Sequence, residues 1–74
     1  MSTNDSIKRA ILALISNDYG EKVGKVFAET TVQDTFPIFL HNSYLLLRDL
    51  VGKNKARVQI DSVLDRFNLV VPYE

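Results

Sequence analysis

Apolar residues recur at helical spacing in four separate segments of this chain, and this pattern limits the possible folds more than any other feature. In residues 6–18 the apolar positions follow i, i+3, i+4, i+7 and i+8 spacing, which places them on one face of a helix. Residues 21–34, 44–51 and 58–67 show the same period. We expect the four stripes to meet in one core that contains the following residues: Ile11, Leu14, Val26, Phe27, Leu47, Leu50, Val63, Leu64 and Phe67.

The residues between these segments indicate where helices end and begin. Asp18 and Glu21 have the spacing of a capping box, so we expect one helix to stop and the next to start around them. Gly52 is typical of a residue that ends a helix. Pro37 predicts a break, with a short strand or an irregular loop around it. Gly24 lies inside the second helix at a cost of about 1 kcal/mol relative to alanine, so we expect it to allow a close helix contact.

After the fourth segment the pattern changes to a short strand at residues 69–73, "LVVPY". Helices followed by a strand are the order of a winged helix-turn-helix. The predicted fold class is therefore mainly α: a winged-helix or helix-turn-helix-like bundle of about four helices with a short C-terminal strand. We expect residues 1–74 to form one domain.

Three motifs connect the chain to a known family. They are "ILALISNDYGEKVGKVFAET", "LLLRDLV" and "VLDRFNLVVPY". Over residues 7–73 the chain resembles the N-terminal helix-turn-helix domain of the large winged-helix subunit of RNA polymerase III. The segment "DTFPIFLHNSY" is longer and more apolar than the corresponding turn of that family. The resemblance implies a nuclear transcription complex, in which such a domain packs on other subunits near DNA.

Composition argues against several other functions. The chain has no cysteine, one histidine, and nine basic against nine acidic residues, which gives a net charge of zero. His41 stands beside Asn42 and Ser43, but adjacent residues rarely have the geometry of a nucleophile and its base. No apolar run approaches the roughly 20 residues of a membrane helix. We therefore expect no enzyme, no cofactor, no metal site and no membrane contact, and an intracellular location.

A nucleic-acid interface is one candidate site. The fourth helix and the turn before it supply side chains that suit phosphate or base contacts. Asp61 and Asp65 lie on the same surface and would repel a phosphate backbone, so an ordinary solvated face is the alternative. The candidate nucleic-acid contacts are Lys53, Lys55, Arg57, Gln59 and Arg66.

A partner-docking surface is the second candidate site. Aromatic side chains often anchor protein interfaces, and this chain has more of them than a small core needs. The alternative is that Phe36 and Phe39 close the core over the loop. The candidate docking residues are Tyr19, Phe36, Phe39 and Tyr44. We expect Phe36, Phe39 and Tyr44 to be partly exposed in the isolated domain.

The sequence thus predicts an assembly module of a transcription complex that binds other protein subunits or a second copy of itself, with weak DNA contact. The alternative is an autonomous small winged-helix regulator that binds nucleic acid, as a dimer. The location is the nucleus if the resemblance holds and the cytoplasm otherwise.

Overall fold

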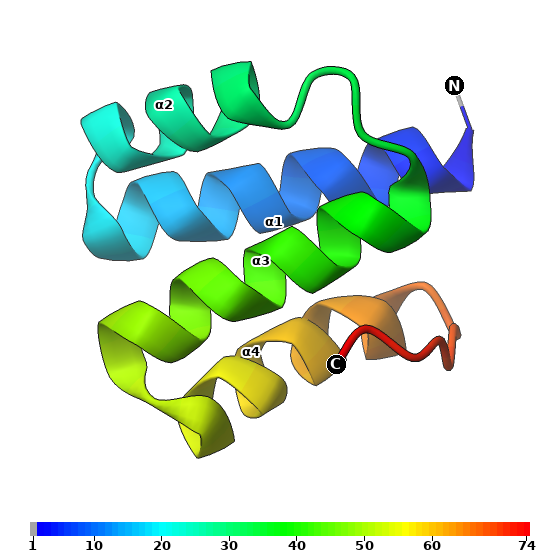
Figure 1. The fold of residues 1–74 in the computed structure, drawn as a ribbon. Helices are drawn as coiled ribbons and strands as arrows, with labels where there is room; N and C mark the ends of the chain where they lie inside the picture. The colour runs from blue at the N-terminus through cyan, green and yellow to red at the C-terminus, as the bar shows by residue number, and fades with distance from the viewer. Residues whose placement is uncertain (1) are drawn as a thin grey trace.

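Four helices account for most of the chain, as Figure 1 shows. The computed structural model describes residues 2–74, with helices α1 (Thr3–Tyr19), α2 (Glu21–Thr30), α3 (Phe36–Val51) and α4 (Lys53–Arg66). Helices α1 and α2 form one hairpin, and α3 and α4 form a second. The mainly helical bundle expected from the sequence is therefore confirmed.

A single glycine joins the two helices of each hairpin. Gly20 and Gly52 have φ angles of +107° and +91°, which side-chain-bearing residues rarely adopt. Each glycine donates its backbone N–H to the helix that it ends and lies directly before the first residue of the next helix. The capping box expected at Asp18 and Glu21 is wrong, because Asp18 still belongs to α1 and no side chain caps α2.

Helix α3 begins earlier than the sequence indicated. The expected break at Pro37 is wrong, because this proline lies in the first turn of α3, where a missing N–H costs no hydrogen bond. Residues 53–57 were expected to form a turn, but they are the first part of α4. Helix α2 ends earlier than expected, at Thr30, and the linker 31–35 leads to α3.

The strand expected at residues 69–73 is not found, and residues 2–74 contain no strand. A strand needs a neighbour to share its backbone hydrogen bonds, and the helical bundle offers none. Instead the chain turns at Asn68, which has a φ of +55°, and the tail folds back over α3 and α4. Tyr73 near its end is buried in the core.

The core draws on all four helices and the tail. Five of the nine expected core residues are buried, and these are Ile11, Phe27, Leu47, Val63 and Leu64. Leu14 and Phe67 are half-buried at its edge. Val26 and Leu50 are a correction, because 52% and 45% of their surfaces are exposed.

Gly24 lies at a close contact between helices α1 and α2. A Cβ atom at Gly24 would lie 3.1 Å from the Cβ and 3.3 Å from the Cα of Ser16 on α1, and it would clash with the Ser16 hydroxyl. The predicted close contact is therefore confirmed. It allows α2 to pack closely against α1.

Candidate functional site

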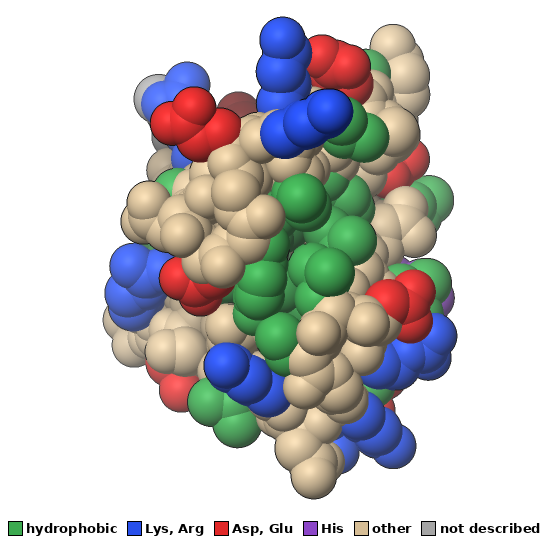
Figure 2. All heavy atoms as spheres, turned by 90° about the vertical axis from the view of Figure 1, so that its left-hand side faces the viewer, with side chains coloured by type: hydrophobic (Ala, Val, Ile, Leu, Met, Phe, Trp, Pro, Cys, Tyr) green, Lys and Arg blue, Asp and Glu red, His purple; other side chains and the backbone are tan. Residues whose placement is uncertain are grey.

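An apolar groove lies between α2 and α3. Its volume is about 430 Å³, and it is lined by Lys22, Val23, Val26, Phe27, Thr30 and Leu46. Figure 2 looks onto this face and shows hydrophobic side chains gathered in its middle, with basic side chains at the upper edge. We call this feature the α2–α3 groove.

The groove exists because α2 packs along α1 and reaches α3 only at one end. There the rings of Phe27 and Phe39 lie 5.7 Å apart between centroids. The linker that joins α2 to α3 closes the same end, since Lys8 donates to the backbone oxygen of Asp34 at 3.2 Å and Asn42 donates to its carboxylate at 2.9 Å. At the opposite end α2 begins and α3 finishes (Figure 1).

The aromatic residues predicted to dock a partner do not form the groove. Phe39 and Tyr44 are core residues with 2% and 4% exposure, so the expectation that they are partly exposed is wrong. The reason is the early start of α3, which places both rings on the inner face of a helix. Phe36 is half-buried against the core. Tyr19 is also half-buried, and its hydroxyl donates to Gln59 Oε1 at 3.0 Å.

The predicted nucleic-acid contacts divide into two groups. Arg57 forms an ion pair with Glu74 at 2.7 Å. Gln59 accepts from the Tyr19 hydroxyl and donates to Asp18 at 3.4 Å, so it is turned toward α1. The other three residues are exposed, and these are Lys53, Lys55 and Arg66. Nucleic-acid binding by this surface stays a prediction.

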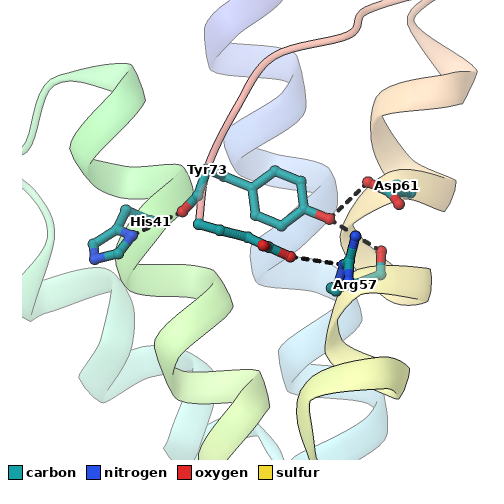
Figure 3. A network of polar contacts seen from close by, with 5 residues as sticks. His41, Arg57, Asp61 and Tyr73 are labelled. Carbon is teal, nitrogen blue, oxygen red and sulfur yellow. Dashed lines mark hydrogen bonds and ion pairs between the residues drawn. The ribbon is translucent and has the colours of Figure 1, made fainter.

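The C-terminal tail is held by a polar network that the sequence analysis missed (Figure 3). His41 on α3 lies 2.8 Å from the backbone oxygen of Tyr73, and this carbonyl requires its Nδ1 to be the donor. The Tyr73 hydroxyl donates to Asp61 at 2.7 Å and to the Arg57 backbone oxygen at 3.4 Å. Its ring lies 5.5 Å from that of Tyr44 between centroids.

Burial and the adjacent Asp61 carboxylate together raise the pKa of Tyr73 well above its usual range. Both effects disfavour the phenolate, since one removes water and the other adds a negative charge beside the hydroxyl. Tyr73 therefore stays protonated as a hydrogen-bond donor. This network anchors the tail to α3 and α4.

Neither a metal centre nor a membrane span emerges from the described residues. Within residues 2–74 no three His, Asp or Glu side chains converge as metal ligands would. None of the described helices has the length and apolar character needed to cross a bilayer.

Comparison with known proteins adds no relative. No family model, no curated protein and no solved structure matches this chain.

The sequence did contain a signal for the groove. The apolar face of α2 is wide, because it includes Val23, Val26 and Phe27. One neighbouring helix covers only part of so wide a face. Spacing alone predicts a core position for Val26, because a helical period does not show how many neighbours a helix has.

Proposed function

We propose that this chain is a non-catalytic protein-docking module that binds its partner through the α2–α3 groove. The observation that carries the proposal is an apolar groove of about 430 Å³ on a chain of only 74 residues. Grooves between two helices are a recurrent way of binding an amphipathic helix, whose apolar side chains project at i, i+3, i+4 and i+7. The groove contains one charged lining residue, Lys22, at its edge.

Charge and local structure favour a protein partner over nucleic acid. The net charge of zero lacks the basic excess that supplies most of the affinity for phosphates. Arg57 and Gln59 are already engaged within the chain. A single residue, Gly52, joins α3 to α4, whereas a helix-turn-helix usually has a turn of about three or four residues.

The finer parts of the sequence-based interpretation rest on the family resemblance alone. They are the winged-helix assignment, a place in a transcription complex such as that of RNA polymerase III, and a nuclear location. They stay predictions, and the docking proposal does not depend on them.

The docking proposal is tested with a labelled helical peptide that has leucine at i, i+3, i+4 and i+7. Fluorescence anisotropy of this peptide should rise with the wild-type chain, and a peptide with serine at those positions should give no rise. Val26→Asp should weaken binding by about tenfold or more, because a carboxylate in an apolar interface loses its water without gaining a partner.

Val58→Asp is the matched control. Val58 is 66% exposed on α4 and does not line the groove, so the same substitution there should leave the affinity unchanged. An equal loss of peptide affinity in both variants would contradict the proposal, because it would indicate non-specific binding to exposed apolar residues. Tighter binding of a short DNA duplex at physiological salt would instead favour the nucleic-acid regulator.

A further inference from the structure

We infer that the surface between α3 and α4 is a recognition site for an extended protein segment, and that the tail, residues 69–74, occupies this site as an intramolecular ligand. The segment that fits the site has the pattern apolar-x-apolar-x-Tyr-acid. We call this surface the tail site, and its residues are His41, Tyr44, Arg57 and Asp61. The inference goes beyond the proposed function, because none of these four residues lines the α2–α3 groove.

The tail lies on the helices as a bound peptide does, without secondary structure of its own. Residues 69–74 contain no helix or strand, and Figure 3 shows the tail passing between α3 and α4. The Leu69 N–H donates to the Leu64 backbone oxygen at 3.1 Å. Beyond Leu69, no backbone N–H of the tail donates to a backbone oxygen within residues 2–74. Release of the tail therefore breaks few backbone hydrogen bonds and leaves those of the helices in place.

Side chains of the tail alternate between the helices and solvent. Leu69 and Val71 are half-buried and Tyr73 is buried, whereas the residues between them are exposed. Val70 is 97% exposed. A period of two is that of an extended chain with one face on a surface. Positions 69, 71 and 73 of the segment are therefore the ones that pack on the helices, and position 70 accepts any side chain.

Three polar side chains of the tail site bind three different groups of the tail (Figure 3). His41 lies 2.8 Å from the backbone oxygen of Tyr73. The Tyr73 hydroxyl donates to Asp61 at 2.7 Å, and the Glu74 carboxylate pairs with Arg57 at 2.7 Å. An ionised Asp61 accepts only from a donor such as a hydroxyl, and Arg57 pairs only with an acid. The site therefore distinguishes tyrosine from phenylalanine and an acidic residue from a basic one.

The tyrosine ring is the anchor of the segment. The Tyr73 ring is buried, and its centroid lies 5.5 Å from that of Tyr44 in a tilted arrangement. Aromatic pairs at such a separation are favourable beyond the area that they bury. Buried aromatic anchors also carry much of the energy of protein interfaces. The pair of Arg57 and Glu74 is half exposed, so it contributes less to affinity than the ring does.

Covalent attachment keeps the tail site occupied by the tail itself. The tail follows α4 through a turn at Asn68, so its effective concentration at the site is about millimolar or higher. A separate segment with the same chemistry binds when the tail is displaced or weakened. The partner that this site fits is therefore an extended protein segment that competes with the tail.

Peptide binding to a chain with a weakened tail tests the inference. The probe is a labelled LVVPYE peptide, which has the sequence of residues 69–74. Fluorescence anisotropy should show an affinity for the Tyr73→Ala variant about tenfold or more above that for the wild-type chain, in which the intact tail competes. The peptide LVVPAE should not bind, because it lacks the anchor. The peptide LVVPYK should bind more weakly than LVVPYE, because its lysine meets Arg57.

Glu74→Lys is a second variant, and it keeps the buried ring in place. Glu74 is exposed, so the fold should survive while repulsion from Arg57 weakens the tail. LVVPYE should bind this variant about threefold more tightly than it binds the wild-type chain. Glu29→Lys on α2 is the matched control, since it makes the same charge change at an exposed residue outside the tail site and should leave the affinity unchanged. If Tyr73→Ala does not fold, Glu74→Lys alone decides the question.

Two further substitutions locate the bound peptide, and each is combined with the weakened tail. Arg57→Glu should reverse the charge preference, so that LVVPYK binds more tightly than LVVPYE. Val26→Asp should leave the affinity for LVVPYE unchanged, because Val26 lines the α2–α3 groove and not the tail site.

Three results would overturn the inference. One is that LVVPYE binds the weakened chains no better than it binds the wild type, and another is equal affinity for LVVPYE and LVVPAE. The third is loss of LVVPYE binding in Val26→Asp, which would place the peptide in the α2–α3 groove. The docking role of the groove is tested separately by the leucine peptide, so it stands or falls independently of these results.

Discussion

We use the word seam for the boundary between two helices, and two seams of this molecule differ in how they are covered. The seam between α3 and α4 is covered by the chain's own C-terminal tail, with Tyr73 inserted into the core and tied to both helices. The seam between α2 and α3 is covered at one end by Phe27 and Phe39 and is open along the rest. Apolar residues line both seams, so composition alone does not explain the difference.

The comparison predicts that the covered seam contributes mainly to stability and the open seam mainly to binding. The covered seam joins residues more than 30 positions apart through the His41–Tyr73 contact, and removing such a contact should loosen the fold. The open seam holds exposed valine and leucine side chains that contribute less to the single chain. Variants in the covered seam should therefore change the free energy of unfolding, and variants in the open seam should change association.

The largest expected effect is that of Tyr73→Ala in the covered seam. It removes a buried ring and both hydroxyl contacts, so the free energy of unfolding should fall by about 2–4 kcal/mol. Val26→Ala in the open seam should change it by less than about 0.5 kcal/mol. Urea unfolding followed by circular dichroism measures both. Similar losses in the two variants would remove the distinction between the seams.

A middle-sized effect is expected for Gly24→Ala, which tests how α2 is seated. At an open helix position this change would stabilise by about 0.5–1 kcal/mol. Here the new methyl group meets Ser16, so we expect a loss of about 1–2 kcal/mol. The double variant with Ser16→Gly should recover the part of this loss that comes from the clash. Stabilisation by Gly24→Ala alone would show that α2 moves freely on α1.

Within the covered seam, a smaller effect than that of Tyr73→Ala is expected for Tyr73→Phe. Loss of the hydroxyl bonds to Asp61 and Arg57 should cost about 0.5–1.5 kcal/mol at neutral pH. The pKa of Tyr73 is raised in the folded chain, so its contribution to stability is fully present below the ordinary tyrosine pKa of about 10 and is lost as the pH rises above it. Chemical unfolding at a series of alkaline pH values should show a steeper loss for the wild type than for the variant. Parallel curves would contradict the raised pKa.

The sequence predicted the helical content well because that signal is local. The apolar stripes are visible residue by residue, and Gly52 marks the end of α3 by its backbone freedom alone. Pro37 does not by itself distinguish a helix start from a break, because a proline restricts the residue before it in both cases. The same local view did not show which seam is covered. Which seam is covered depends on where Tyr73 packs against the bundle. A contact between residues so far apart in the sequence produces no periodic pattern that could predict it.

The groove proposed as the docking site differs from the aromatic surface that the sequence predicted. Aromatic residues were chosen as anchors, but a helix that starts at Phe36 turns Phe39 and Tyr44 inward. Val26 and Leu50 were assigned to the core from their spacing. They are about half exposed, because a helical period does not show which side of a helix a neighbour covers.

The central claim is that the α2–α3 groove is the docking surface, and methyl NMR during the leucine-peptide titration tests it most directly. Val58 and Val70 are more exposed than Val26 but lie outside the groove, so general apolar adhesion would affect them first. We predict that the methyl signals of Val23, Val26 and Leu46 shift on binding while those of Val58 and Val70 do not. Shifts centred on Val58 or Val70, or shifts spread evenly over all five residues, would contradict the claim.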